Sequence, residues 1–153
     1  MNDDLLESID GGIATLTLNR PAARNALTPR MMTGLTEALP RLAADTTVRV
    51  VVLTGAGNAF CAGGDVKRFA EASDSDPSEK TFDEKVHDLR SRMEVSRVLH
   101  EMPKPTLAVI PGAAAGAGLS LALACDLRIA VDNAKLTTAF SRIGLSGDFG
   151  GSY

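Results

Sequence analysis

Short runs of apolar and β-branched residues recur along the chain, with room for a helix between them. Ile13–Leu18 alternates threonine with apolar residues, as a strand does when one of its faces meets water. Residues 48–53 (VRVVVL) and Thr106–Ile110 (TLAVI) are nearly all apolar, and residues 127–131 (LRIAV) form a further short run. Continuous runs of this kind are typical of sheets that helices cover. We therefore predict strands at all these places, with residues 48–53 buried on both faces.

Apolar residues at helical spacing lie between the predicted strands. Thr28 and Pro29 suit the cap and the first position of a helix, and the apolar positions Met32, Leu35, Leu39 and Leu42 continue it. Pro40 lies inside this pattern and is predicted to kink the helix or to end it near Leu39.

Two more helices follow along the chain. The first presents Phe82, Val86, Leu89 and Met93 on one face and ends at Met102, before Pro103; the second covers residues 119–124. The polar run at residues 72–78 (ASDSDPS) predicts a loop ahead of the first of them. Strands that alternate with helices in this way indicate the α/β class.

Composition narrows the classes of protein that the chain can belong to. It has 153 residues, of which 44% are hydrophobic, and this is enough apolar material for a core and excludes wholesale disorder. The formal charge of −3 argues against a broad basic face for nucleic acid, and aromatic residues, at 4%, are too few for a base-stacking platform. We expect one domain and no nucleic-acid partner.

The compartment is also predicted from the sequence. The acidic N-terminus lacks the apolar segment of a secretory signal, and no run reaches the roughly 18 apolar residues of a membrane span. The two cysteines, Cys61 and Cys125, lie far apart, so their spacing supports no zinc site and favours a reducing compartment. We expect a cytoplasmic protein with no membrane partner and no metal.

A first glycine-rich loop, residues 60–65 (FCAGGD), follows the predicted strand at residues 48–53. Its glycines allow backbone N–H groups to point outward, and Asp65 would cap a helix that begins there. The helix dipole would add positive potential in front of the loop, so the loop suits an anion or a developing oxyanion. A plain tight turn is the alternative interpretation.

A second loop, residues 112–120 (GAAAGAGLS), follows the strand Thr106–Ile110 and also opens a helix. Its glycines lack the spacing of a dinucleotide fingerprint, and no lysine follows them as a phosphate-binding loop requires. Close packing of a helix on a sheet would explain its small residues equally well. Taken together, the two loops predict N–H groups that hold one carbonyl oxygen from two sides.

These segments, in this order, resemble the crotonase (enoyl-CoA hydratase/isomerase) family. The matching segments are residues 18–21 (LNRP), 25–27 (NAL), 50–55 (VVVLTG), 60–65 (FCAGGD), 111–118 (PGAAAGAG), 124–126 (ACD) and 143–145 (IGL). The resemblance covers nearly the whole chain and implies a spiral of repeated β-β-α units. It implies that residues 1–153 form a single crotonase-type core domain, cut before the family's C-terminal helices. An exposed apolar seam is expected where those helices would pack.

The resemblance implies an acyl-CoA thioester as substrate, with no separate cofactor. The thioester oxygen would be held by the backbone N–H groups of Gly64 and Ala117. The residues implied for CoA binding are Ala62, Gly63, Asp65 and Gly116, with Arg24 as a phosphate contact and Lys67 as a weaker one. Solvated side chains are the alternative interpretation of both cations. Family members are usually trimers or pairs of trimers, so a homo-oligomer is implied as well.

The residues in the family's catalytic positions favour isomerisation. The two glutamates of the family's hydratases fall here on Ser120 and Phe140, which argues against straightforward hydration. Asp148 remains, and isomerase branches, including enzymes that act on ring-type acyl-CoA substrates, carry an aspartate at the matching place. Apolar surroundings with Phe140 and Phe149 would raise its pKa towards the working pH.

Other interpretations stay open for the same residues. Asp148 would otherwise shape a turn, or would attack an aryl ring as a nucleophile. Asp126, next to Cys125, is interpreted as structural, and Ser120 lacks the partners of a hydrolase nucleophile. The alternatives to a double-bond isomerase are an enoyl-CoA hydratase of fatty-acid degradation and a CoA-binding homologue without catalysis.

Overall fold

The computed structural model describes residues 3–65 and 81–152, so the predicted loop at residues 72–78 and Lys67 lie outside the described residues. The strands are β1 (Leu5–Asp10), β2 (Ile13–Leu18), β3 (Val50–Gly55), β4 (Ala59–Cys61), β5 (Thr106–Ile110), β6 (Ala113–Ala115), β7 (Leu127–Ala130) and β8 (Leu136–Thr137). The helices are α1 (Pro29–Ala44), α3 (Phe82–Glu101) and α4 (Ala117–Ala124), with 3-10 turns η1 (Pro21–Ala23) and η2 (Phe140–Ile143).

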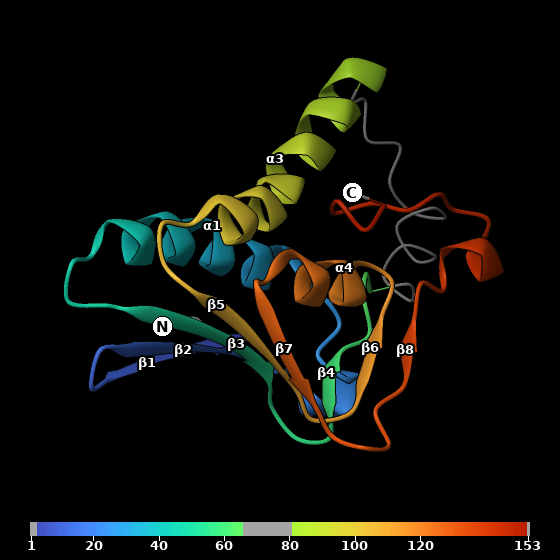
Figure 1. The fold of residues 1–153 in the computed structure, drawn as a ribbon. Helices are drawn as coiled ribbons and strands as arrows, with labels where there is room; N and C mark the ends of the chain where they lie inside the picture. Colours follow the sequence, from blue (N-terminus) through green and yellow to red (C-terminus); the bar gives the residue numbers. More distant parts are fainter. Residues whose placement is uncertain (1–2, 66–80, 153) are drawn as a thin grey trace.

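Consecutive strands divide between two sheets (Figure 1). From β3 onward the strands come in three consecutive pairs, β3–β4, β5–β6 and β7–β8. The first strand of each pair joins β1 and β2 in a five-stranded sheet of order β1-β2-β3-β5-β7. The second strands form a three-stranded sheet of order β4-β6-β8. Strands from successive pairs run parallel in both sheets. Each pair thus adds one strand to each sheet, and α3 and α4 follow the first two pairs. This is the predicted spiral of β-β-α units.

Strand β1 was not predicted from the hydrophobic pattern. It pairs with β2 in an antiparallel hairpin, which turns at Gly11 and Gly12 with φ of +54° and +82°. Tight hairpin turns need positive φ at such positions, and glycine adopts it without strain. Only Leu5 of β1 is buried, so the strand shows no alternation of apolar and polar residues.

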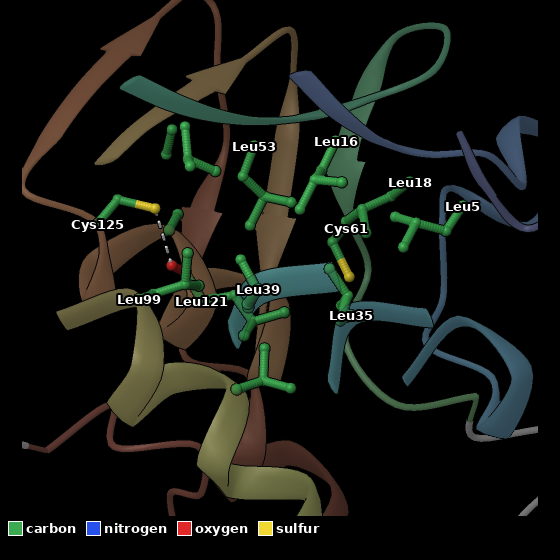
Figure 2. Packing of buried hydrophobic residues seen from close by; sticks show 14 of the residues in the cluster. Leu5, Leu16, Leu18, Leu35, Leu39, Leu53, Cys61, Leu99, Leu121 and Cys125 are labelled. Carbon is green, nitrogen blue, oxygen red and sulfur yellow. Dashed lines mark hydrogen bonds between the residues drawn. The ribbon is translucent and has the colours of Figure 1, made fainter. Parts of the chain in front are cut away.

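The main core lies between the five-stranded sheet and the helices, which cross one face of that sheet (Figures 1 and 2). The sheet contributes Leu16, Leu18 and Leu53, α1 contributes Leu35 and Leu39, α3 contributes Leu99 and α4 contributes Leu121, all at most 1% exposed. Full burial of a leucine side chain contributes about 1.5–3 kcal/mol. The core therefore fixes the positions of the helices that follow β4 and β6.

Helix α1 begins as predicted but ends later. The Thr28 hydroxyl oxygen accepts the Met31 N–H at 3.1 Å, and Pro29 occupies the first helical position. The prediction that Pro40 ends the helix near Leu39 is wrong, because α1 continues to Ala44. Pro40 lies on the exposed side of α1, where water can solvate the carbonyl that proline leaves unbonded, while Leu42 is fully buried beneath the last turn.

Lys104 closes the C-terminal end of α1 from a distant part of the chain. Its Nζ donates hydrogen bonds to the carbonyl oxygens of Leu42 and Asp45, both at 2.7 Å, and of Val48 at 2.9 Å. The Leu42 carbonyl is in the last turn of α1, where a helix has no N–H group left to bond it. The Asp45 and Val48 carbonyls lie in the segment that follows the helix.

The Lys104→Met variant keeps the apolar stem and removes all three hydrogen bonds. We expect its free energy of unfolding to fall by about 2 kcal/mol, because hydrogen bonds from charged donors are the stronger ones. Urea denaturation measures the loss. Lys85→Met, at an exposed position on α3, is the matched control and is expected to change stability by less than about 0.5 kcal/mol. Equal losses in the two variants would contradict the role of Lys104.

Helix α3 leaves part of its predicted apolar face exposed, and the prediction that residues 48–53 are buried on both faces is wrong. Helix α3 buries Val95, Ser96 and Leu99, whereas Phe82 is 78% exposed, because the N-terminal half of the helix projects away from the sheet (Figure 1). Strand β3 buries alternate residues only, so the face of the sheet opposite α1 is partly open in the described chain.

Exposed apolar side chains gather on the last elements of the chain. They are Leu123 on α4, Leu127 and Ile129 on β7, Leu136 on β8, and Val131 and Leu145 in the segments that follow, all between 44% and 61% exposed. The β1–β2 hairpin and α3 expose large apolar side chains as well, so the apolar seam stays a prediction.

Candidate active site

The candidate site lies where the strands of the three-stranded sheet end. Strands β4, β6 and β8 are parallel, so the segments that follow them meet at one edge of the sheet. These segments are residues 62–65, 116–118 and 138–140, and the first two are parts of the two glycine-rich loops of the sequence. Ligands of α/β proteins bind preferentially at the carboxyl ends of parallel strands.

The two glycine-rich loops pack directly against each other. Gly63 has a φ of +89°, and a Cβ on it would lie 2.8 Å from the Ala115 carbonyl oxygen and 3.4 Å from the Ala117 nitrogen. Only glycine allows this approach. The loops therefore lie together as predicted, whereas the binding of a carbonyl oxygen by Gly64 and Ala117 stays a prediction.

Ala117 is the first residue of α4, and its N–H is one of the four that an α-helix leaves without a partner of its own at the N-terminus. Gly116 precedes it with a φ of +52° and donates its own N–H to the Thr137 carbonyl at 3.0 Å. The helix dipole adds positive potential at this end. The second loop thus presents a donor beside the first loop.

A segment near the N-terminus borders the first loop. The Ala62 N–H donates to the Arg24 carbonyl at 2.9 Å, and the Leu27 N–H donates to the Gly63 carbonyl at 2.8 Å. The structure therefore brings Arg24 alongside Ala62 and Gly63, as a shared CoA site would require. The Arg24 side chain is exposed, so solvation of its charge remains open.

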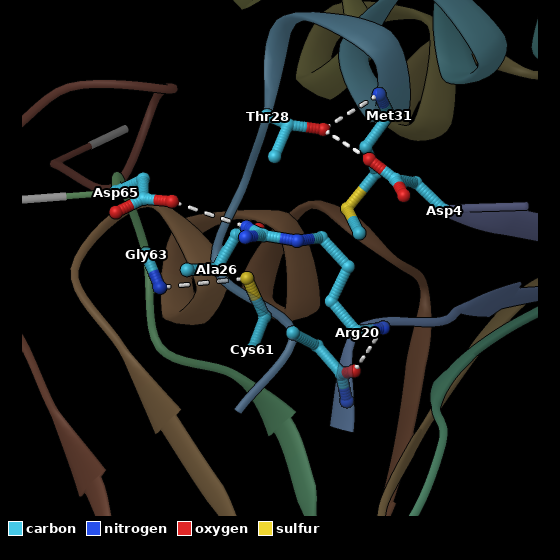
Figure 3. A network of polar contacts seen from close by, with 9 residues as sticks. Asp4, Arg20, Ala26, Thr28, Met31, Cys61, Gly63 and Asp65 are labelled. Carbon is cyan, nitrogen blue, oxygen red and sulfur yellow. Dashed lines mark hydrogen bonds and ion pairs between the residues drawn. The ribbon is translucent and has the colours of Figure 1, made fainter. Parts of the chain in front are cut away.

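Asp65 has a partner that was not predicted from the sequence. Its Oδ2 accepts a hydrogen bond from Nη1 of Arg20 at 3.1 Å, and the same Nη1 donates to the Ala26 carbonyl at 3.0 Å (Figure 3). The predicted helix that Asp65 would cap lies outside the described residues. The observed role of the carboxylate is to tie the first loop to the segment that carries Arg24.

Asn25 is a second residue whose role was missed. It is fully buried, and its Nδ2 donates to the carbonyl oxygens of Ala56 at 3.0 Å and Ala59 at 2.8 Å, while its Oδ1 accepts the Arg20 N–H at 2.8 Å. Its φ of +56° suits asparagine better than most residues. Asn25 thereby joins the turn before β4 to the Arg20 segment.

The loop with Asp148 is fastened to α4. The Ser120 hydroxyl donates to the Asp148 carbonyl oxygen at 3.0 Å, and Phe149 is buried in the core at 6% exposure. Ser120 lies one helical turn after Ala117, so the anchored loop approaches the end of α4 that carries the candidate donor. This hydroxyl bond also agrees with the view that Ser120 is not a hydrolase nucleophile.

The Asp148 carboxyl group lies in an environment that favours its neutral form. Burial raises its pKa above the ordinary value, against a smaller lowering effect of its own backbone N–H. Its Oδ1 is buried and has no hydrogen-bond partner in the described part of the chain. The predicted direction of the pKa shift is therefore confirmed.

Phe140 supplies apolar surface between the second loop and the Asp148 loop. Its ring atoms lie 3.6 Å from the position of a Cβ on Gly116 and 3.8 Å from that of a Cβ on Gly147. The ring thus lies next to Gly116 of the second loop and next to Gly147, the neighbour of Asp148.

The remaining candidate residues are structural. Asp126 Oδ2 accepts hydrogen bonds from the Thr106 N–H at 2.8 Å and hydroxyl at 2.9 Å, and its own N–H donates to the Thr106 Oγ1. Burial raises the pKa of both Cys61 and Cys125 to about 12, so neither thiol is a nucleophile near neutral pH. Within residues 3–65 and 81–152, no three potential metal ligands cluster, and no helix has the length and apolar character of a membrane span.

Comparison with known proteins agrees with this geometry. The sequence model of a family described as "Enoyl-CoA hydratase/isomerase" matches residues 8–153. The 1,2-epoxyphenylacetyl-CoA isomerase of Escherichia coli (strain K12) is 39% identical over 100% of this chain and 57% of its own length. A Rhodobacter capsulatus protein named "Probable enoyl-CoA hydratase" is 42% identical over 95% of this chain and 52% of its own length.

Solved structures show the same similarity. The crystal structure of an enoyl-CoA hydratase from Polaromonas sp. JS666 matches with a TM-score of 0.85 and 37% identity, over 97% of this chain and 56% of that chain. The crystal structure of an enoyl-CoA hydratase/isomerase from Mycobacterium paratuberculosis matches with a TM-score of 0.83 and 31% identity. The match covers 97% of this chain and 57% of that chain. The chain spans about half the length of the curated relatives it matches.

Proposed function

The chain belongs to the enoyl-CoA hydratase/isomerase family, and on this premise we propose that it binds an acyl-CoA thioester and moves a double bond along the acyl chain. The Gly64 and Ala117 N–H groups bind the thioester oxygen, and Asp148 carries the proton between two carbons. The name of the E. coli relative supports an isomerase over a hydratase, although the substrate in that name is an epoxide and not an enoyl chain.

The proposed reaction needs one base and one oxyanion site. The Asp148 carboxylate takes a proton from C2 of a 3-enoyl thioester, and the electron pair passes into a dienolate whose charge rests on the thioester oxygen. The carboxylic acid then returns the proton to C4, which leaves the 2-enoyl thioester. Two preorganised N–H donors stabilise the dienolate, and loss of one such donor typically costs about 10²–10³ in rate.

The state of the Asp148 carboxyl group is the observation that carries the proposal. It combines a raised pKa, an oxygen with no hydrogen-bond partner among the described residues, and a loop fastened to α4 near Ala117. A base for this chemistry must accept a proton readily at working pH. Ser120 and Phe140, at the positions implied for the hydratase glutamates, supply no second carboxylate.

The CoA part of the substrate is proposed to lie along the first loop. Ala62, Gly63 and Gly116 present backbone to it, and Arg24 contacts a phosphate. Asp65 acts through its ion pair with Arg20 by holding the loop in place. Lys67 is proposed as a further phosphate contact from the sequence alone. A cytoplasmic homo-oligomer, trimer or hexamer, is part of the same proposal.

The proposal is tested with two thioesters and the protein expressed from its complete reading frame. With 3-hexenoyl-CoA, we expect 2-hexenoyl-CoA to form. The ultraviolet absorbance of the conjugated product monitors this reaction. With crotonyl-CoA, we expect little 3-hydroxybutyryl-CoA by chromatography. Hydration without isomerisation would overturn the assignment, and binding of CoA without turnover of either thioester would favour the non-catalytic alternative.

Hydration is the second candidate function, because several similar proteins carry hydratase names. It would need Asp148 to activate water and another group to protonate C2. Turnover of crotonyl-CoA that is lost in both Ser120→Ala and Asp148→Asn variants would support it.

A further inference from the structure

The side chain of Cys61, at the start of the first loop, contacts both Gly63 of its own loop and Gly118 of the second loop. Cys61 is the last residue of β4 and is fully buried. A Cβ on Gly118 would lie 2.4 Å from the Cys61 carbonyl oxygen, 2.6 Å from its Cβ and 2.8 Å from its Sγ. The bare Cα of Gly118 therefore packs on Cys61, with no space for an added methyl group.

Cys61 also contacts the first loop. Its Sγ accepts the Gly63 N–H at 3.4 Å, as the dashed line in Figure 3 shows. Gly63 in turn lies against Ala115 and Ala117 of the second loop. The pairing of β4 with β6 is irregular at this point, since the register shifts between Ala59 and Cys61. The strand ladder is therefore irregular here, and both the carbonyl group and the side chain of Cys61 contact the second loop.

We propose that Cys61 is a positioning residue that sets the separation of the Gly64 and Ala117 N–H donors. This inference rests on the proposed function, because the separation matters only if both donors bind one oxygen. Such donors must lie about 2.7–3.1 Å from the developing oxyanion, and a misplacement of about 1 Å costs on the order of 10²-fold in rate. The role is one of size and shape and involves no chemistry at the thiol.

The test changes the contact from both sides. Cys61→Val adds a methyl group next to Gly118, and Gly118→Ala adds a Cβ next to Cys61. Cys61→Ser keeps the unbranched shape and the hydrogen-bond acceptor on a slightly smaller side chain, so it adds no volume next to Gly118. Cys125→Val is the matched control, because Cys125 is another buried cysteine, at 3% exposure, at the far end of α4.

Three quantities are measured for each variant: kcat with 3-hexenoyl-CoA, the Kd of unreactive butyryl-CoA, and the infrared stretch of its 13C-labelled thioester carbonyl when bound. For Cys61→Val and Gly118→Ala, we expect kcat to fall at least about tenfold with Kd within about twofold, and the carbonyl stretch to return towards that of the free thioester. Cys61→Ser is expected to retain wild-type values, and Cys125→Val to lower the melting temperature only.

Wild-type kcat and carbonyl stretch in Cys61→Val or Gly118→Ala would overturn the inference. If neither variant folds, Cys61→Ala takes their place, because it removes Sγ without adding volume, and an unchanged carbonyl stretch there would count against the role. A wild-type protein that shifts the carbonyl stretch but does not isomerise would overturn the proposed function alone. A wild-type carbonyl stretch equal to that of free butyryl-CoA would overturn both.

Discussion

Replacement of Asp148 by asparagine is expected to lower the isomerisation rate by about 10²–10⁴-fold, because a positioned base typically contributes this much. Asparagine has nearly the same shape, so the loop and its hydrogen bond from Ser120 remain. The rate is measured with 3-hexenoyl-CoA. Asp10→Asn, at an exposed position on the β1–β2 hairpin, is the control. An Asp148→Asn variant with the wild-type rate would contradict the assignment of the base.

The same variant is expected to unfold at a higher urea concentration at pH 7. Burial raises the pKa of Asp148 in the folded protein above its ordinary value of 3.8, so the folded state holds the proton more tightly than the unfolded state. Stability therefore falls as the pH rises from 3.8 through the raised pKa, and asparagine removes this loss. The advantage of the variant should shrink as the pH falls towards 3.8.

The same carboxyl group makes catalysis depend on pH, but the catalytic rate rises with pH where the stability of the folded protein falls. The base acts as a carboxylate, so kcat/KM of the wild type is expected to rise with pH through the raised pKa of Asp148 and then to level off. A profile whose lower limb lies at the ordinary carboxyl value would contradict the burial of the carboxyl group. Greater stability together with lost activity in one variant is the signature expected of a functional carboxylate.

Replacement of Gly112 by alanine is expected to destabilise the fold by about 3 kcal/mol, at the upper end of overpacking effects. A Cβ at this position would lie 2.0 Å from the Asn58 carbonyl oxygen and 2.9 Å from its carbon. Both atoms belong to the backbone that leads into β4, so no side-chain rotation relieves the contact.

Urea unfolding measures this effect against a second glycine. Gly11 has positive φ, +54°, but nothing within 4 Å of an added Cβ. Gly11→Ala is therefore expected to cost only the backbone strain of about 1–2 kcal/mol. A loss at Gly112 no larger than the loss at Gly11 would contradict the overpacking, because Gly112 has no positive φ that alanine would strain.

Local sequence patterns predicted the elements whose burial follows a simple period. Ile13–Leu18 and Thr106–Ile110 are strands with the predicted bounds, and Thr28 caps α1 as predicted. Strand β6 was missed because its residues, Ala113–Ala115, have low strand propensity. It is a strand because β4 and β8 pair with it on either side, and this is a tertiary effect.

The candidate site was predictable where glycines and a lone acid mark it. The two loops pack against each other as predicted, and the role of Asp148 stays a prediction. The ion pair of Arg20 with Asp65 joins residues 45 positions apart, and the hydrogen bond of Asn25 to Ala59 spans 34. Nothing in the local sequence encodes these partners, because they meet only after β3 and β4 have been placed in different sheets.

The division of consecutive strands between two sheets also governs the order in which the molecule forms. The hydrogen bond from the Thr54 hydroxyl to the Val109 carbonyl, which links β3 to β5, spans 55 residues. Chains dominated by such non-local pairing search longer for their native contacts and commonly fold in milliseconds to seconds. Because β5 and β6 are consecutive and lie in different sheets, we expect β6 to reach β4 only after β5 has joined the large sheet, so the contact between the two glycine-rich loops is expected to form late.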